Sequence, residues 1–551
     1  MIMNTPCNAA ETHTVFNQPP PLDPYNLFTT DTALREALQQ APVQWAETQL
    51  NDYGYLSGHT LFSAGFLANE NMPQFHSHDR FGHRMDQVAF HPAYHQLMQT
   101  AIEHGLPSSP WQTPQPGAHV ARAAMMYLHN QVEAGSCCPL TMTFAAVPAI
   151  RHQPDIAAHW LPLITARHYD PANKPWFEKP GVTIGMAMTE KQGGTDVRAN
   201  TTRARPLGQS GPGQLYALTG HKWFCSAPMS DAFLVLAQTD KGLSCFLLPR
   251  WREDGQRNGF YIQRLKDKLG NRSNASSEVE FREAHAWLVG EEGRGVATII
   301  DMVALTRFDC ITGSAALMRQ AVAQAVHHCS HRQVCGKVLT DHPLIQNVLA
   351  DLALESEAAL AFSLRIAQSL DHPDDEQEQL FCRIATAIGK YWVCKRAPGH
   401  INEAQECLGG AGYVEESILP RLYREAPVNS IWEGSGNVQC LDILRAMQRQ
   451  PDSLEAVFAE LEKTAGTDPQ LGQYITTLKK DLVNTSNFHY EARRLVEKLA
   501  ICLQGSLLLQ TGNALVADAF LRARLQPEGL AYGTLPTGIP CTQLIERTRP
   551  L

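Results

Sequence analysis

Hydrophobic residues follow two different periods along the chain, and the change of period divides it into helical and strand-rich regions. From Thr32 onward apolar residues recur at helical spacing, and residues 118–165 continue this pattern with interruptions near Gly135 and Pro139. After Gly181 the pattern becomes alternating, with turn residues between short segments at 214–219, 232–239, 243–248 and 277–281. We therefore predict helices followed by a compact β-domain.

Helical spacing returns at residue 291 and continues to residue 397. Pro343 opens the clearest helix there, in which Leu344, Ile345, Val348, Leu349 and Leu352 form one apolar stripe. After Pro451 the pattern predicts further amphipathic helices, before the sequence loosens at 529–540; these helices are expected at 454–461, 474–483, 489–508 and 515–525.

The first thirty residues are polar and rich in proline, including Pro19-Pro20-Pro21. They predict either an extended arm that crosses a neighbouring surface or a frayed terminus. With this segment included, the patterns predict four parts: a helical domain with an extended arm at 1–184, a β-domain at 185–288, a second helical domain at 289–450, and a C-terminal helical extension at 451–551.

The composition is that of a globular protein. The chain has 551 residues, of which 44% are hydrophobic and 18% charged, and this length predicts two to four domains. The net charge of −9 gives no sign of a polyanionic partner. The 14 cysteines are scattered without a CxxC pair, which is typical of a reducing compartment. No signal peptide or membrane-length apolar run is found, so we expect a soluble cytoplasmic protein that binds no membrane.

Five histidines lie close together between Phe75 and His95, and a metal site is one interpretation of them. No HExxH motif accompanies them, and they lie among proline, glycine and charged residues. A metal site needs a specific ligand set and geometry, so we predict no metal here. The five residues are His76, His78, His83, His91 and His95.

One carboxylate has surroundings that suit a catalytic base. Glu433 lies between Trp432 and the small run Gly434-Ser435-Gly436. Small residues let a flat ligand approach the backbone, and the indole supplies a dry wall. Such a pocket desolvates a carboxylate and raises its pKa, which makes it a better base near neutral pH. The alternative is a glutamate at an ordinary loop-to-helix junction.

A second stretch, MAMTEKQGGTD at 186–196, suits recognition of a phosphate or a heterocycle. Thr189 and Thr195 stand on either side of Gly193-Gly194, and backbone N–H groups beside paired glycines bind such groups. Alone, a loop of this kind is most often a β-turn. Neither GxGxxG nor GxxxxGK[ST] occurs, so a Rossmann loop and a P-loop are both excluded.

Together with Phe224-Cys225-Ser226, these stretches resemble the acyl-CoA dehydrogenase superfamily of flavoproteins over roughly residues 90–450. That family has a TEP-x-x-G-S-D loop, an aromatic-x-Ser/Thr strand, and an aromatic-Glu-Gly-Thr/Ser motif. The stretches THTVFNQPPPL, GHKWF, RLKDKLGNRSNAS and NSIWEGSGN are further similar to its AidB-like branch, the alkylation-response flavoproteins. The resemblance implies a mainly α fold: a helical domain, a central β-barrel, and a four-helix bundle with a C-terminal extension.

The resemblance also implies FAD as the cofactor and a homotetramer in which two chains complete each FAD site. It places Thr189 at the flavin pyrimidine edge, Thr195 at the pyrophosphate, and Ser226 at N5 or O4. Either Phe224 or Trp223 would stack near the isoalloxazine. The implied cofactor residues within one chain are Met186, Met188, Thr189, Gly194, Thr195, Phe224, Cys225, Ser226, Ile431, Trp432, Gly434, Ser435 and Asn437.

Two further motifs resemble segments that reach the FAD of a neighbouring subunit. One begins at Arg332 and the other at Glu406, and they imply contacts from Arg332, Glu406, Gly409 and Gly410. The chain departs from the family pattern at Cys335, Pro343 and Glu406, which replace Phe, Gln and Gln. A carboxylate near a pyrophosphate repels it unless Arg332 or another cation compensates.

In the AidB-like branch the C-terminal extension carries double-stranded DNA binding. From Pro451 onward this chain has 11 acidic and 10 basic residues, so the sum is close to neutral. DNA binding would therefore depend on basic residues gathered on one face. The candidates are Arg445, Lys479, Lys480, Arg493, Arg494, Arg522 and Arg524. The alternative is a helical domain that builds the tetramer.

The resemblance implies that Glu433 removes the α-proton of an acyl thioester while the flavin accepts the β-hydrogen. Trp432 is bulkier than the usual Tyr, so we expect weak turnover of short or branched acyl-CoA. An ordinary acyl-CoA dehydrogenase without DNA binding stays open. So does a DNA-associated protective flavoprotein whose dehydrogenase site is vestigial, or which detoxifies small alkylating agents. A nitroalkane oxidase on this scaffold typically has Asp at this position, and Glu433 argues against it.

Overall fold

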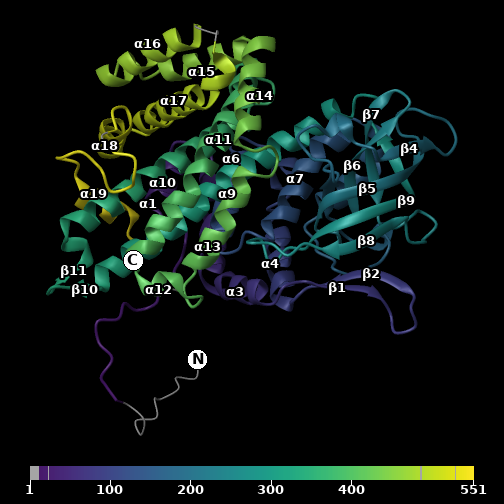
Figure 1. Ribbon diagram of the computed structural model, residues 1–551, viewed down its shortest axis with the longest axis horizontal. Coiled ribbons are helices and arrows are strands. Elements are labelled where there is room, and N and C mark those ends of the chain that lie inside the picture. Colours follow the sequence, from purple (N-terminus) through teal and green to yellow (C-terminus); the bar gives the residue numbers. More distant parts are fainter. Residues whose placement is uncertain (1–11, 23, 484–486, 528, 551) are drawn as a thin grey trace.

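A computed structural model of the chain describes residues 12–22, 24–483, 487–527 and 529–550. Long helices form one part of the molecule and a β-barrel forms the other, with shorter helices between them (Figure 1). This is the mainly helical fold with a central barrel that the resemblance implied.

The first helical part begins at α1 (Thr32–Gln39), where the Asp31 carboxylate accepts the N–H of Leu34 at 3.0 Å and so caps the helix. Gly135 lies between two helices as expected, whereas Pro139 lies in the first turn of α7, where its missing N–H costs nothing. The remaining helices are α2 (Glu47–Leu56), α3 (Phe62–Glu70), α4 (Pro92–Glu103), α5 (Ser109–Gln112), α6 (Ala118–Asn130), α7 (Cys137–Arg151) and α8 (Pro154–Ile164).

A β-hairpin interrupts these helices where the histidines cluster. It consists of β1 (Gln74–His78) and β2 (Arg84–Ala89), and periodicity did not predict it. His83 pairs with Asp79 at 3.1 Å, and His95 hydrogen-bonds the Tyr169 hydroxyl at 2.8 Å. Among the described residues, no three His, Cys, Asp or Glu side chains are placed to hold a metal ion.

The barrel is closed by five strands in the order β6-β4-β5-β9-β7, because β7 also pairs with β6. Its interior is filled by aromatic and aliphatic side chains such as Phe233, Phe246 and Phe281. The short polar strand β4 had no alternating pattern and was not predicted. β8 was not predicted either, although Phe260 and Ile262 are buried in the barrel core and alternate with more exposed residues. The strands are β3 (Ile184–Ala187), β4 (Arg203–Pro206), β5 (Leu215–Ser226), β6 (Ala232–Thr239), β7 (Gly242–Pro249), β8 (Phe260–Leu265) and β9 (Ser276–Val289).

Three long helices, α9 (Gly295–His331), α10 (Pro343–Leu370) and α11 (Glu376–Cys407), pack on one another. α10 begins at Pro343, as predicted. A small hairpin of β10 (Gln333–Val334) and β11 (Lys337–Val338) separates α9 from α10. The shorter helices that follow are α12 (Gly410–Tyr413), α13 (Leu419–Glu425) and α14 (Gly436–Arg449).

The C-terminal extension docks on this bundle (Figure 1). Arg365 of α10 bridges Glu378 at 2.7 Å and Glu460 of α15 at 2.9 Å. None of the described helices is long and apolar enough to cross a bilayer. The extension contains α15 (Asp452–Glu462), α16 (Pro469–Val483), α17 (Phe488–Gln510), α18 (Ala514–Arg524) and α19 (Cys541–Thr548), of which α19 was not predicted.

Residues 12–22 run without helix or strand to the end of α9, while residues 1–11 and 23 of the predicted arm lie outside the described residues. The Asn17 side chain accepts the Gln333 N–H at 2.7 Å and donates to the Gln333 carbonyl at 2.8 Å. Arg332 donates to the Asn17 carbonyl at 2.6 Å. The described part of the arm is therefore bound to its own chain.

Candidate active site

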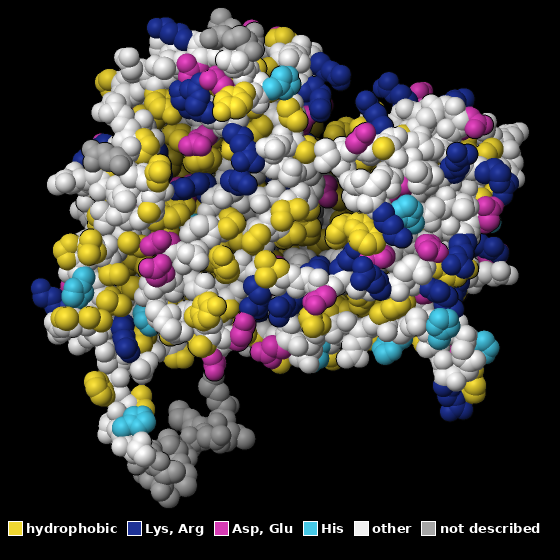
Figure 2. Space-filling view, viewed as in Figure 1, with side chains coloured by type: hydrophobic (Ala, Val, Ile, Leu, Met, Phe, Trp, Pro, Cys, Tyr) yellow, Lys and Arg dark blue, Asp and Glu magenta, His cyan; other side chains and the backbone are white. Residues whose placement is uncertain are grey.

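The two motifs singled out in the sequence meet on one hydrophobic cluster. Trp432 packs against it from the helical side, and Met186 and Met188 pack against it from the barrel side. The cluster itself contains Met142 of α7 and Met302 of α9. Figure 2 shows the surface hollowed between the helical part and the barrel, with hydrophobic side chains at the floor of the hollow.

The Cys138 thiol of α7 connects the two sides of the site. Burial raises its pKa to about 11, the Ser226 hydroxyl acts to lower that pKa, and the Glu433 carboxylate acts to raise it. Cys138 and Ala227, the residue after β5, belong to the hydrophobic cluster against which Trp432 packs. The end of β5 and the Glu433 loop therefore adjoin the same cluster.

Glu433 has a backbone conformation that few non-glycine residues adopt. Its φ angle is +56°, in the left-handed region, which costs about 1 kcal/mol or more. Its carbonyl accepts Arg307 Nε at 2.9 Å and Gln439 Nε2 at 3.2 Å. The buried Lys390 ammonium donates to the carbonyls of Asn429 and Gly434, both at 3.0 Å. These donors hold the loop in its strained conformation.

The Glu433 carboxylate is partly buried, and one hydroxyl binds it. Thr306 of α9 donates to its Oε2 at 3.1 Å. Burial raises the pKa of Glu433, and this effect outweighs the opposing effects of Thr306, Lys390 and Arg307. A carboxylate whose pKa lies above its ordinary value is a stronger base, which is the property predicted for it.

An ion-pair cluster fixes Arg307 beneath the loop. Its guanidinium pairs with Asp442 of α14 at 2.9 Å, and Arg383 of α11 pairs with the same carboxylate at 2.8 Å. Arg307, Thr306 and Lys390 were not predicted. They are polar residues of the long helices α9 and α11, and no spacing rule marked them as partners of the loop.

On the barrel side, a buried ion pair fixes the glycine-containing loop. The Glu190 carboxylate accepts Lys222 Nζ at 3.0 Å and the N–H groups of Thr201 and Thr202 at 2.7 and 3.0 Å. Burial acts to raise the pKa of Glu190, but Lys222 and these donors outweigh it and hold that pKa below its usual range. Lys222 itself belongs to the quoted GHKWF stretch.

The packing at Gly194 requires the absence of a side chain. A Cβ atom there would lie 2.4 Å from Thr189 Oγ1, which is closer than real contacts allow. The threonine hydroxyl therefore lies directly against the glycine backbone. Residues 193–196 are exposed, so the loop presents this backbone to solvent.

A β-bulge redirects the aromatic side chains of β5. Lys222 pairs with Val279 and Cys225 with Ser277, so β5 has one extra residue between these points. The Phe224 side chain is 49% exposed, whereas the Cys225 side chain is fully buried in the barrel core. The bulge therefore turns the Cys225 thiol inward, so a cofactor contact from Cys225 would come from its backbone, and that contact stays a prediction.

Lys266 stands over both aromatic rings that were candidates for stacking. Its Nζ lies 3.2 Å from the Trp223 ring centroid and 4.7 Å from the Phe224 ring centroid. This cation–π contact occupies one face of Trp223. Phe224 keeps more of its ring free.

A hydroxyl relay joins Ser226 to a buried cation. Ser226 Oγ lies 3.3 Å from Ser276 Oγ, which accepts Lys268 Nζ at 2.9 Å. Burial lowers the pKa of Lys268 to about 8. Lys268 lies in the quoted RLKDKLGNRSNAS stretch, but no spacing rule assigned it to the site.

Comparison with known proteins identifies the fold and the family. Three family descriptions match: "Adaptive response protein AidB N-terminal domain" at 17–171, "Acyl-CoA dehydrogenase, middle domain" at 185–284, and "Acyl-CoA dehydrogenase, C-terminal domain" at 293–448. The chain is 45% identical over 525 residues to "Putative acyl-CoA dehydrogenase AidB" of Escherichia coli (strain K12), covering 94% of this chain and 95% of that one. The chain belongs to the AidB-like branch of the acyl-CoA dehydrogenase family.

More distant relatives extend the likeness. "Acyl-CoA dehydrogenase family member 11" of Caenorhabditis elegans is 30% identical over 456 residues, which are 79% of this chain and 72% of that one. A crystal structure of Caenorhabditis elegans ACDH-11 in complex with C11-CoA superposes with a TM-score of 0.85 at 26% identity. It covers 96% of this chain and 97% of that chain.

Membership of the acyl-CoA dehydrogenase family implies FAD as the cofactor, and the site residues fit it. The indole N–H of Trp432 is buried and finds no hydrogen-bond partner among the described residues. Its neighbour Ile431 is 63% exposed, and Ser435 and Asn437 are also exposed. A planar ligand that is rich in hydrogen-bond acceptors would cover this open surface and accept the unpaired indole N–H.

The motifs of this family that reach a neighbouring subunit lie far from Glu433 within one chain. Thr306 and Arg332 are 26 residues apart on one continuous helical path, which corresponds to about 39 Å. A Cβ at Gly409 or Gly410 would meet nothing within 4 Å, and Glu406 is exposed, so this surface is open.

The predicted DNA-binding residues differ in their exposure and in their ion pairs. Arg445, Lys480 and Arg493 are exposed on α14, α16 and α17. Lys479 pairs with Glu462 at 2.6 Å, Arg494 with Glu491 at 3.0 Å, and Arg522 with Asp518 at 3.5 Å. Arg524 departs furthest from the prediction: its side chain is 13% exposed and pairs with Asp351 and Glu355 of α10.

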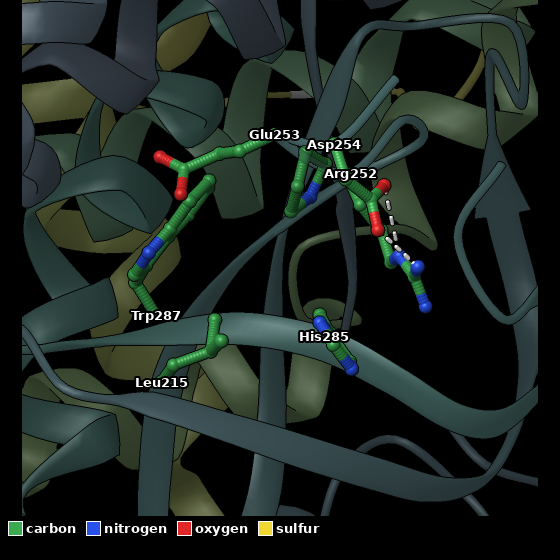
Figure 3. Close-up of a pocket in the computed structure, with 7 residues that line it drawn as sticks. Leu215, Arg252, Glu253, Asp254, His285 and Trp287 are labelled. Carbon is green, nitrogen blue, oxygen red and sulfur yellow. Dashed lines mark hydrogen bonds and ion pairs between the residues drawn. The ribbon is translucent and has the colours of Figure 1, made fainter. Parts of the chain in front are cut away.

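A separate cavity of about 200 Å³ lies at the other end of the barrel (Figure 3). Leu215, which lines it, is the first residue of β5, whereas Ser226 is the last. Trp287 and His285 of β9 form part of its wall, and Arg252 pairs with Asp254 beside them. The cavity is therefore about 35 Å along the strand from the candidate active site.

Proposed function

We propose that this chain is an FAD-dependent acyl-CoA dehydrogenase in which Glu433 is the catalytic base. The observation that carries the proposal is the position of Glu433: a carboxylate with a raised pKa, on a loop that shares one hydrophobic cluster with the glycine-containing loop of the barrel. Bound FAD supplies the hydride acceptor for the β-hydrogen of the substrate.

Glu433 would remove the α-proton of the acyl thioester. Thr306 holds Oε2, and we assign the proton to the other oxygen, Oε1. The neighbouring Lys390 and Arg307 keep the carboxylate ionised near neutral pH, while partial burial keeps it basic. The hydrophobic cluster under Trp432 excludes water, which strengthens every electrostatic interaction inside the site.

The cofactor would be held mainly by the barrel. Thr189 and the backbone of Gly194 would bind it, Phe224 would stack on it, and Ser226 would donate to its edge. The relay from Ser226 through Ser276 to Lys268 places a positive charge behind that hydroxyl. A cation in this position favours the gain of negative charge on reduction.

Trp432 narrows the space beside the base. Its indole packs on the central cluster and fills volume that a smaller ring would leave open. We therefore propose weak turnover, limited to short or branched acyl chains. The relative crystallised with C11-CoA gives a long-chain comparison for this test.

The test compares Glu433→Gln and Glu433→Asp with the wild type. Glu433→Gln should keep yellow, bound FAD but lose bleaching by short-chain acyl-CoA, because an amide cannot accept the proton. Glu433→Asp should retain slow bleaching, since a shorter carboxylate is still a base. Bleaching of Glu433→Gln at the wild-type rate would remove Glu433 from the role.

We further propose a homotetramer in which Arg332, Glu406, Gly409 and Gly410 meet a neighbour's FAD. Their open surface and their distance from Glu433 in one chain support this. Light scattering of the FAD-loaded protein should give four chains. Arg332→Gln should weaken FAD binding without changing bleaching once FAD is saturating. A stable monomer that retains FAD would contradict the proposal.

Double-stranded DNA binding by the extension is the second candidate function. The exposed cations Arg445, Lys480 and Arg493, and the matched adaptive-response family description, favour it. A mobility shift with duplex DNA should be strong at low salt and weaken steeply as salt rises. If no mobility shift occurs at low salt, DNA binding is contradicted and the alternative, an acyl-CoA dehydrogenase without DNA binding, is favoured.

A cytoplasmic location and a role with alkylating agents stay predictions.

A further inference from the structure

One residue of the C-terminal extension reaches the loop that carries Glu433. Arg493, in the second turn of α17, donates from Nε to the Asn437 side-chain oxygen at 2.8 Å. Asn437 lies four residues after Glu433, in the first turn of α14. A segment fifty-six positions away in sequence is thus hydrogen-bonded to the active-site motif.

The surroundings of Arg493 hold it against this loop. Its guanidinium carbon lies 6.0 Å from the ring centroid of Tyr391, a buried residue of α11. A Cβ at Gly436 would lie 3.4 Å from the Tyr391 ring and 3.6 Å from Arg493 Nη2. The tyrosine ring and the guanidinium therefore both lie beside the Gly436 backbone.

Other cations of α17 are used differently. Lys498, five residues further along the helix, pairs with Asp481 at 2.7 Å and so stays within the extension. Arg494 pairs with Asp481 and Glu491, also within the extension. Arg493 differs from both because its hydrogen bond leaves the extension for α14.

We propose that Arg493 is a positioning residue for the active-site loop, acting through Asn437. The inference rests on the proposed function, in which the loop from Ile431 to Asn437 contacts FAD. With Lys390 and Gln439 fixing the Gly434 carbonyl, Arg493 fixes the other end of the loop. The extension is then a structural part of the flavin site.

The test measures FAD affinity in the full-length protein by titrating the apoprotein with FAD and following flavin fluorescence. Arg493→Gln should weaken FAD binding about 3- to 10-fold, which is part of the effect of losing one charged hydrogen bond, because the loss reaches FAD only through Asn437. The FAD affinity of Arg493→Lys should lie between those of the wild type and Arg493→Gln, because the ammonium keeps one donor but lacks the planar guanidinium. Lys498→Gln removes the same charge from the same helix and should change affinity less than about 2-fold.

A double-mutant cycle separates positioning from general destabilisation. If Arg493 acts through Asn437, then Arg493→Gln should add little to Asn437→Ala. The bleaching rate at saturating FAD and acyl-CoA should also fall in Arg493→Gln, because the loop carries the base. Additive effects, or equal effects of Arg493→Gln and Lys498→Gln, would overturn the inference.

Two outcomes distinguish this inference from the proposed function. If the wild type binds no FAD, both fail together. If the wild type binds FAD and bleaches with acyl-CoA while Arg493→Gln behaves like the wild type, only the positioning role fails. Should Arg493→Gln not fold, Asn437→Ala probes the same hydrogen bond from its other side, and unchanged FAD affinity there would refute the role.

Discussion

Removing the hydroxyl of Thr306 is the most specific way to test the role of Glu433 as the base. Replacing Thr306 with Val keeps the shape of the side chain and removes only the donor to Glu433 Oε2, 3.1 Å away. The same hydroxyl also lies 2.9 Å from the Val303 carbonyl, so its single proton is shared between two acceptors. Thr306 is buried, so in the Val variant bulk water will not take the place of the lost hydroxyl.

The size of the effect follows from the hydrogen bond. A net hydrogen bond to a charged group contributes about 1.5 kcal/mol, and sharing the proton reduces this to about 0.7–1.5 kcal/mol. One pKa unit corresponds to about 1.4 kcal/mol. Since Thr306 acts to lower the pKa of Glu433, its loss should raise that pKa further, by about 0.5–1 unit.

The assay is the anaerobic rate of flavin bleaching by a saturating short-chain acyl-CoA, measured between about pH 5 and pH 9. A higher pKa leaves less ionised base at low pH, so the acid limb should move up by about 0.5–1 unit while the plateau rate changes little. Thr312→Val is the matched control, because this buried threonine of α9 bonds Ser363 and not Glu433. An acid limb that stays in place or moves down would refute the reasoning, as would an equal shift in Thr312→Val.

Three further predictions concern the framework of the site. Arg365→Met leaves Glu378 and Glu460 without their shared cation and should lower the free energy of unfolding by about 2–4 kcal/mol in urea titrations, whereas the exposed Arg522→Met should cost under about 1 kcal/mol. Because the pKa of Glu190 lies below its ordinary value of 4.5 in the folded protein, the Glu190–Lys222 pair stabilises the fold above about pH 4.5 and loses this effect as pH falls toward the folded pKa. Lys222→Met should therefore flatten this part of the acid-denaturation curve, and an unchanged curve would contradict the assignment. Gly194→Ala should weaken FAD binding by displacing Thr189, while Gly208→Ala, where a Cβ meets nothing within 4 Å, should leave it unchanged.

The parts of the fold with strong periodicity were predictable. Helical spacing predicted a helical region at 291–397, which contains α9, α10 and most of α11, and proline marked the start of α10. Motif resemblance singled out Glu433, and its raised pKa agrees with the predicted desolvation. The polar strand β4 was not predicted because its ladder partner, not its own side chains, makes it a strand. In β8 the alternation of Phe260 and Ile262 with more exposed residues was a signal that was missed.

Contacts between distant residues were not predictable in the same way. Thr306 and Glu433 are 127 residues apart, and a threonine inside an apolar helix has no spacing that marks it as a partner of a base. The inward position of the Cys225 thiol was not predictable, because motif position does not reveal a bulge. The burial of Arg524 was not predictable, because a charge in a sequence does not show whether it faces solvent or a buried carboxylate.

The central claim is that one carboxylate and one bound flavin together oxidise an acyl thioester. Its most direct test is an anaerobic titration of the FAD-loaded protein with a short-chain acyl-CoA, following the oxidised-flavin absorbance in parallel for the wild type and Glu433→Gln. We predict stoichiometric bleaching of the wild type and a persistent yellow spectrum for the variant. A wild type that stays yellow with every acyl-CoA, or a variant that bleaches equally, would contradict the account.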